Sequence, residues 1–219
     1  MALLKITSPH AHGPHDTGWV MRQVMLATLP GILALTWFFG FGTLINIVWA
    51  CLVAVSCEAL FLSLRGRPVM FYLKDCSALV TAVLLGIALP PYAPWWLVMI
   101  GVMFAILIAK HLYGGMGYNP FNPAMVAYVI LLISLPVQMT QWAAPQLPGN
   151  NGMIGPIDAL LNNFGFINVI DAHTMATPLD VMKQNSSLMM DQLWDANPQF
   201  GWLAGVGWEW ANIGFLIGG

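Results

Sequence analysis

Long apolar runs separated by short gaps dominate the first 136 residues of this chain. The runs lie at residues 23–39, 43–64, 77–89, 95–109 and 122–136, and a sixth starts near residue 202. A helix needs about 20 residues to cross the hydrocarbon core of a bilayer, so the first two are long enough to span and several others are short. Pro30-Gly31 is expected to break the first run, and Gly40-Phe41-Gly42 to form a tight turn. The pattern predicts an all-α integral membrane protein with about five to six transmembrane helices, some of them short and broken.

Composition supports this fold class and excludes others. Of the 219 residues 58% are hydrophobic and only 7% are charged, whereas soluble domains carry about 25% charged residues. So few charges cannot cover a water-facing surface, which excludes an ordinary soluble enzyme and also a disordered chain. The net charge is −2, without a basic run, so nucleic acid is not expected as a partner. The three cysteines show no CxxC spacing, and no metal site or disulfide framework is predicted.

The two signs of charge lie in different parts of the chain. Six of the seven bases lie in the N-terminal tail or in gaps between apolar runs, including the gaps at residues 65–74 and at Lys110. By the positive-inside tendency these gaps and the N-terminus are predicted to be cytoplasmic. Residues 137–207 hold most of the acids and one Lys, which predicts a large periplasmic loop. The acids are Asp158, Asp171, Asp180, Asp191 and Asp195.

Three regions follow from this pattern. We expect an N-terminal membrane domain at residues 1–136, a periplasmic loop at 137–207, and the start of a further membrane helix at 208–219. The first 20 residues are polar and rich in His and Pro, so no cleavable signal peptide is predicted. Because the last apolar run stops at Gly219, the chain is interpreted as a C-terminally truncated piece of a longer protein.

The short third and fifth runs resemble each other. SALVTAVLLGIALP, from Ser77, and PAMVAYVILLISLP, from Pro123, agree at 7 of 14 positions, and both end in Leu-Pro. Paired short segments of this kind indicate a site built from broken helices near the membrane midplane. The other interpretation is a chance match between two strings rich in Leu, Val and Ala.

A loop dense in Gly, Asn and Pro follows Lys110 and precedes the fifth run. An irregular backbone of this kind must lie in water or line a protein-enclosed cavity, because lipid leaves its polar groups unsatisfied. Its glycines allow a flat or phosphorylated ligand to approach the backbone, and its amides offer hydrogen bonds. The loop is therefore either part of a cofactor or ion site or a plain cytoplasmic turn. The candidate residues are Gly114, Gly115, Gly117, Asn119 and Asn122.

Glu58 lies inside the second run, and an ionisable group at membrane depth is a functional candidate. It could instead extend toward the interface or toward Arg65, about two turns away. His10, His12 and His15 have a metal-like spacing but no acidic or Cys partners, and are interpreted as a solvated tail.

Thr177-Pro178-Leu179-Asp180 is typical of a helix start, with Thr at the N-cap and Pro in the first turn. The N-cap hydroxyl lies at the positive end of the helix dipole, where free backbone N–H groups can hold a phosphate. A phosphate esterified to Thr177 would therefore be favoured there.

Three segments together carry a resemblance to a known family: KDCSALVTAVLLGIALPP, GGMGYNPFNPAMVAYVILLISLP and DAHTMATPLD. The chain resembles the D subunits of the Rnf ion-translocating electron transport complexes and the related B subunits of the sodium-translocating NADH:quinone reductases. In that family a flavin transferase attaches FMN through its phosphate to a Thr in a D-x-x-[S/T]-G-A-[S/T] motif. The resemblance implies Thr177 as the acceptor, with Asp171, Thr174 and Ala176 completing the motif. Met175 stands where the motif has Gly.

The resemblance also implies partners and a second cofactor. The expected partners are the other subunits of an Rnf-type complex, a flavin transferase and the lipid bilayer, and the implied location is a bacterial inner membrane. A related subunit holds a non-covalent riboflavin, which the loop at residues 114–122 would help to bind. The chain is then a flavin-carrying subunit that passes electrons and couples them to Na⁺ or H⁺ movement, with no catalytic residue of its own. The alternative is a non-redox transporter or channel subunit that uses the broken helices and Glu58, with Thr177 only a helix cap.

Overall fold

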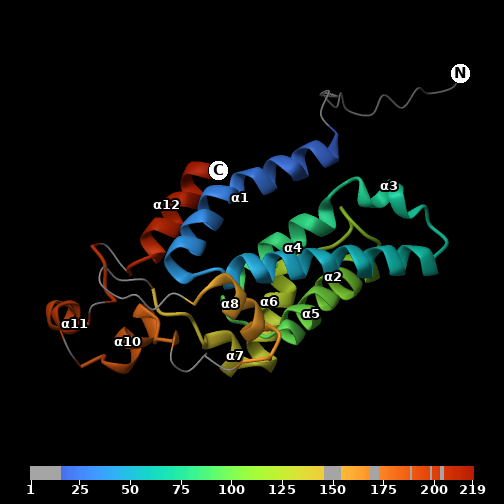
Figure 1. The fold of residues 1–219 in the computed structure, drawn as a ribbon. Helices are drawn as coiled ribbons and strands as arrows, with labels where there is room; N and C mark the ends of the chain where they lie inside the picture. The colour runs from blue at the N-terminus through green and yellow to red at the C-terminus, as the bar shows by residue number, and fades with distance from the viewer. Residues whose placement is uncertain (1–15, 146–153, 168–172, 188, 198, 203–204) are drawn as a thin grey trace, which may run out of the picture.

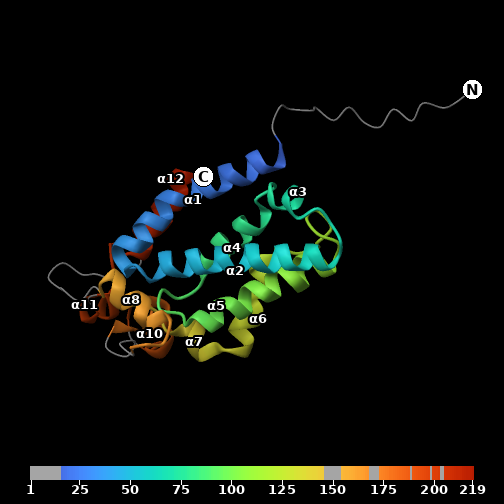
Figure 2. The same cartoon turned by 45° about the vertical axis from the view of Figure 1, so that its right-hand side comes forward.

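A computed structural model describes residues 16–145, 154–167, 173–187, 189–197, 199–202 and 205–219 of this chain. In these ranges the chain is all-helical apart from two isolated β-bridges, as the sequence predicts. Asp171 and the three N-terminal histidines lie outside the described residues. The helices form an elongated bundle, with α3 near one end and α10 and α11 at the other (Figures 1 and 2).

Within the described ranges, three helical stretches are long and apolar enough to cross a membrane: α1 (Thr17–Phe39), α2 (Gly42–Leu64) and the continuous stretch Trp95–Leu112. The last begins as α5 (Trp95–Met103) and continues as the π-helix η1 (Phe104–Leu112). A π-helical segment is rare and frequently marks a functional site. Gly40, with φ of 87°, makes the expected turn between α1 and α2.

The short third and fifth runs fold as α4 (Ser77–Ala88) and α6 (Pro123–Ser134), each of 12 residues. Each is about 18 Å long, well short of the roughly 30 Å hydrocarbon core. Pro90 and Pro136 follow their C-terminal ends, where a proline cannot continue a helix. The short helices α3 (Val69–Leu73) and α7 (Pro136–Thr140) flank them.

The main core forms where α2, α4, α5, η1 and α6 pack together. Its buried residues are mostly Ala, Val and Leu, and small side chains let the helices approach closely. At Gly86 of α4 a β-carbon would lie 3.0 Å from the Cα atom of Ile47 in α2. Of the two short helices, α4 is enclosed by longer ones, and Leu85 is fully buried. α6 buries one face at Leu131 and leaves Val129 and Ile133 exposed.

A second helix pair corrects the expectation that Pro30-Gly31 breaks the first run. α1 continues through both residues and packs along α12 (Trp208–Gly218). The residues suit this packing, because a β-carbon on Gly31 would overlap the ring of Phe215 in α12. Pro30 removes one helical hydrogen bond, but neighbouring helices commonly accommodate a proline in a membrane helix. Figure 1 shows the two helices side by side.

The described part of the polar region contains the short helices α8 (Pro156–Asn163), α10 (Pro178–Gln184) and α11 (Met190–Ala196). A buried amide pair connects this region to the membrane helices. Asn163 Nδ2 donates to Asn46 Oδ1 at 3.1 Å and to the Pro91 carbonyl at 3.1 Å. Asn46 Nδ2 donates to the Pro90 carbonyl at 2.8 Å. These bonds join α8 to α2 and to the turn after α4.

Candidate functional site

The structure presents two candidate sites at opposite ends of the bundle. One is a cleft at the α3 end, which contains Glu58 and part of the glycine-rich loop. The other surrounds Thr177 at the end where α10 and α11 lie (Figures 1 and 2). No cluster of three or more His, Cys, Asp or Glu able to hold a metal ion occurs among the described residues.

Glu58 is paired with Lys110. The Nζ atom of Lys110 donates to Glu58 Oε1 at 2.6 Å, and both side chains are at most 4% exposed. The same ammonium donates to Ser77 Oγ at 2.7 Å, at the start of α4. His111 Nε2 lies 3.4 Å from Glu58 Oε1, and the imidazole stacks on Phe61.

This geometry corrects two expectations about the charges. Glu58 does not extend to Arg65, whose guanidinium lies over the Phe61 ring. Lys110 does not lie in a solvent-exposed gap, because it is inside η1 and only 3% exposed. Lys110 is therefore weak evidence for the cytoplasmic side of the membrane. The exposed bases Arg22, Arg65, Arg67 and Lys74 remain as evidence for that side. A buried ion pair of this kind needs both partners, since either charge alone in a low dielectric is costly.

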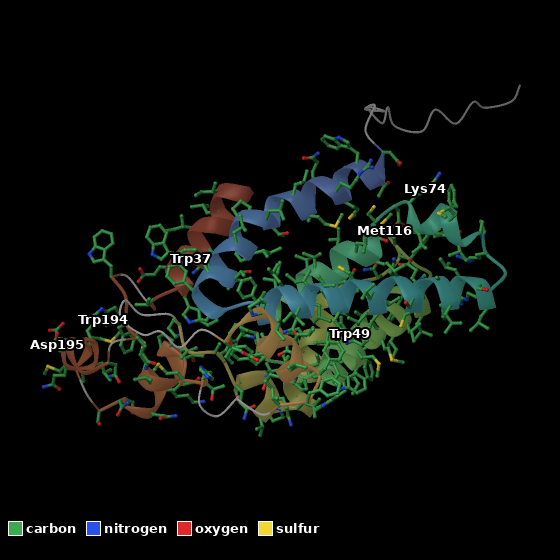
Figure 3. All side chains as sticks on the ribbon, in the orientation of Figure 1. Trp37, Trp49, Lys74, Met116, Trp194 and Asp195 are labelled. Atoms are coloured by element: carbon green, nitrogen blue, oxygen red, sulfur yellow. The ribbon has the colours of Figure 1, made fainter. Side chains whose placement is uncertain are left out.

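A cleft of about 670 Å³ opens beside this pair. Its lining combines charged and aromatic residues with Gly114 and Gly115 of the predicted loop, a mixture that suits a planar polar ligand. Lys74 and Met116, which both line it, lie toward the α3 end of the bundle (Figure 3). Gly114 and Gly115 have φ of 110° and 103°, a conformation that glycine adopts without strain.

The other three loop candidates are not among the cleft-lining residues. Asn122 is the N-cap of α6, and its Oδ1 accepts from the Ala124 amide at 3.0 Å. Asn119 Nδ2 donates to the Phe121 carbonyl at 2.8 Å. Gly117 has φ of 86° and shapes the turn. The structure thus gives these three a local structural role and brings only Gly114 and Gly115 to the cleft.

Thr177 forms the predicted N-cap of α10 as part of a capping box. Its Oγ1 donates to Asp180 Oδ2 at 2.6 Å and accepts from the Asp180 amide at 3.3 Å. Pro178 occupies the first turn, as the sequence predicts. α10 has only seven residues, so the dipole argument for phosphate is weaker than the sequence suggested.

Backbone pairing fixes the segment before Thr177 against residues 142–144. The Met175 amide donates to the Trp142 carbonyl at 3.1 Å, and the Ala144 amide donates to the His173 carbonyl at 2.8 Å. Thr174 pairs with Ala143 in an isolated bridge. This pairing places Thr177 beside the Trp142 ring.

An apolar groove of about 400 Å³ borders Thr177. The indole rings of Trp142 and Trp208 line the groove, with their ring centroids 4.7 Å apart. The Trp208 ring also packs on the Phe39 ring, at a centroid distance of 4.8 Å. The lining residues are Trp142, Thr177, Pro178, Leu179, Met182, Gly205 and Trp208. Trp194 and Asp195 of α11 lie at this same end of the molecule (Figure 3).

Sequence reasoning missed several residues of both sites. Lys110 reads as a residue of a gap, although its position directly after an apolar run would also fit the last turn of a helix. Trp142 and Trp208 give no signal beyond that of interfacial aromatics. Gln199, which lines a narrow crevice together with Trp142 and Thr177, gives no signal at all. Contacts between residues far apart in sequence decide these roles: Glu58 and Lys110 are 52 positions apart.

The fold defines an integral membrane protein of several apolar helices, with a polar helical region at one end. A profile of the NQR2, RnfD, RnfE family matches residues 5–219, and this chain belongs to that family. Proteins named as the D subunit of an ion-translocating oxidoreductase complex match along the whole chain: 52% identity in Pseudomonas aeruginosa, 54% in Ectopseudomonas mendocina and 51% in Vibrio atlanticus. The chain spans 62% of the length of the first two relatives and 66% of the third.

Proposed function

We propose that this chain is the flavin-carrying membrane subunit of an ion-translocating electron transport complex, with FMN joined through its phosphate to Thr177. The observation that carries the proposal is the position of Thr177 in the lining of the apolar groove. A phosphoester at Oγ1 tethers the flavin next to Trp142 and Trp208. A volume of about 400 Å³ is in the range of small-molecule sites, and an aromatic lining suits a flat isoalloxazine ring.

The sequence around Thr177 and the names of the relatives support this assignment. DAHTMATPLD agrees with the flavin attachment motif at Asp171, Thr174, Ala176 and Thr177. Relatives at about 52% identity are named as subunits of an ion-translocating oxidoreductase complex. A bound flavin supplies one- and two-electron redox chemistry, and the protein supplies its tether and surroundings.

Attachment of a phosphate changes the capping box in a definite way. Transfer of FMN from a flavin dinucleotide forms the bond between Thr177 Oγ1 and phosphorus and breaks the pyrophosphate bond of the donor, so that AMP leaves. The hydroxyl proton that lies between Thr177 Oγ1 and Asp180 Oδ2 is released, and a negative phosphodiester takes the place of the hydroxyl. The Asp180 carboxylate then faces a like charge and is expected to turn away. Loss of such a cap costs about 1 kcal/mol, which is small enough for the helix to persist.

The test is covalent flavin in the full-length protein, produced together with a flavin transferase. The denatured band should fluoresce under ultraviolet light, Thr177→Ser should retain the fluorescence, and Thr177→Val should lose it. Thr140→Val is the matched control, because Thr140 is an exposed threonine with only local hydrogen bonds in α7. A wild-type band without fluorescence, or a fluorescent Thr177→Val band, would overturn the proposal.

We also propose that the cleft beside Glu58 takes the non-covalent flavin. Gly114 and Gly115 give a ligand access to the backbone there, and Tyr72, Tyr113 and Tyr118 supply aromatic surface. Acid precipitation of the complex should release riboflavin and leave FMN on the pellet. Gly115→Leu should reduce the released fraction and leave the covalent fraction unchanged, and Gly66→Leu at another positive φ is its control. Equal release from the two variants would argue against this location.

A second candidate function is a non-redox transporter subunit. The observation that favours it is the buried Glu58–Lys110 pair at the wall of a cleft, since paired charges at membrane depth commonly mark solute or ion paths. This candidate predicts solute binding by a flavin-free protein. The fluorescence test on Thr177 therefore separates the two functions.

A further inference from the structure

Gln199 has a buried side-chain oxygen that accepts no hydrogen bond from the described residues. The residue is only 5% exposed. Leaving such an acceptor unpaired is unfavourable, and nearly all buried polar groups in proteins are paired. An unsatisfied amide oxygen therefore suggests that a group absent from the chain itself completes it.

The position of Gln199 connects it to the Thr177 site. It lines a narrow crevice of about 10 Å³ that shares Trp142, Thr177, Pro178 and Trp208 with the apolar groove. Its backbone is held in place, because the Val206 amide donates to its carbonyl at 3.0 Å. Gln199 thus contributes a polar side chain to a crevice that adjoins the apolar groove and shares four of its lining residues.

In the described part of the chain, the other buried side-chain atoms without a hydrogen-bond partner lie away from Thr177. Glu58 Oε2 and His111 Nε2 lie at the other end of the bundle, and Asn163 Oδ1 belongs to the amide pair with Asn46. Among the unpaired buried atoms of the described residues, only Gln199 Oε1 is on a residue that lines the surroundings of Thr177.

We propose that Gln199 recognises the pyrimidine edge of the isoalloxazine, with its Oε1 accepting a hydrogen bond from the flavin N3–H. This rests on the proposed function, that Thr177 carries the flavin. The N3–H is flanked by two carbonyl groups, and a primary amide offers both an acceptor and a donor to such an edge. The indoles of Trp142 and Trp208 match the apolar part of the ring, while Gln199 fixes its orientation. One or a few placed polar groups in an apolar site are typical of specific cofactor binding.

The experiment compares Gln199→Leu with Gln192→Leu in the full-length protein, within its complex and produced with the flavin transferase. Gln192 is an exposed glutamine of α11, so the same chemical change is made where no contact is lost. Covalent flavin is measured by in-gel fluorescence and intact mass. The hydrogen bond is measured by the resonance Raman band that contains the N3–H bend, in water and in deuterium oxide.

We expect both variants to carry covalent flavin. In Gln199→Leu the N3–H band should move to lower frequency, and in Gln192→Leu it should stay at the wild-type position. Gln199→Glu keeps the side-chain length and offers a stronger, charged acceptor, so its band should move to higher frequency. This variant also decides the question if Gln199→Leu fails to fold.

The outcomes separate the two proposals. A wild-type protein without covalent flavin overturns the proposed function, whatever Gln199 does. A flavin-loaded protein whose N3–H band is the same in wild type and Gln199→Leu overturns the role of Gln199 alone. Shifts in the same direction for the Leu and Glu variants would also overturn it, because they would report a general disturbance of the groove.

Discussion

The Nζ atom of Lys110 lies 2.6 Å from Oε1 of Glu58, and this contact joins η1 to α2 inside the bundle. Ser77 Oγ, at the start of the short helix α4, accepts a second hydrogen bond from the same ammonium. One buried cation thus connects three helices at the wall of the cleft. The arrangement depends on charge balance, since each ion is shielded from water and stabilised mainly by the other.

Removing one member of this pair is predicted to destabilise the protein strongly. Glu58→Gln or Lys110→Met leaves an uncompensated buried charge, which costs about 3–5 kcal/mol. The double variant Glu58→Gln/Lys110→Met removes both charges, so its loss should be clearly smaller than the sum of the single losses. The midpoint of thermal unfolding in detergent measures all three.

Lys183→Met is the control for this cycle, because Lys183 is exposed on α10 and forms no buried pair. Its unfolding midpoint should stay near the wild-type value. Additive losses from the two single variants would show that Glu58 and Lys110 act independently, contrary to the structure.

The packing of α1 against α12 yields a second prediction. Because a β-carbon at Gly31 would overlap the Phe215 ring, Gly31→Leu should force the two helices apart and cost about 1–3 kcal/mol. Ser56→Leu makes a comparable enlargement on an exposed face of α2 and should leave the unfolding midpoint nearly unchanged. Gly31→Ala should have an intermediate effect. An unaltered midpoint in Gly31→Leu would contradict the close approach of the helices.

A third prediction concerns the attachment of the polar region. Asn46→Leu removes a buried acceptor and a buried donor, so Asn163 Nδ2 and the Pro90 carbonyl each lose a hydrogen bond. Each buried group left unsatisfied is expected to lower the free energy of unfolding by about 1–3 kcal/mol. The polar region should then separate from the membrane helices more easily. Limited proteolysis within residues 146–205 should become faster than in wild type. Asn185→Leu is the control, because its bond to the Val181 carbonyl is local to α10.

The sequence was a good guide to the helices, because length and hydrophobicity are local properties. The short helices α4 and α6 lie within two residues of the predicted runs, and the Thr177 cap has the predicted form. The expected break at Pro30-Gly31 was wrong because tertiary packing overrides the local preference: α12 covers the glycine and the helix continues.

The sites were less predictable, because they are made of contacts between distant segments. Asn46 and Asn163 are 117 positions apart, and no spacing in the sequence connects them. Lys110 could be recognised as a base after an apolar run, but its burial depends on the π-helical turn that carries it. The groove beside Thr177 needs Trp142 and Trp208 from separate segments, so the motif alone indicated only the attachment residue.

The orientation of the bundle in the membrane gives the last prediction. The exposed bases Arg67 and Lys74 line the cleft, Arg65 lies two residues before Arg67, and the acidic polar region lies at the Thr177 end. The positive-inside tendency therefore predicts that the cleft faces the cytoplasm and Thr177 the periplasm. An epitope tag inserted after Gly149 should be accessible to antibody in spheroplasts, whereas a tag after Gly66 should require permeabilised cells. If both tags are accessible under the same condition, the cleft end and the Thr177 end do not lie on opposite sides of the membrane. Accessibility of the Gly66 tag alone would invert the orientation and move the proposed flavin on Thr177 to the cytoplasmic face.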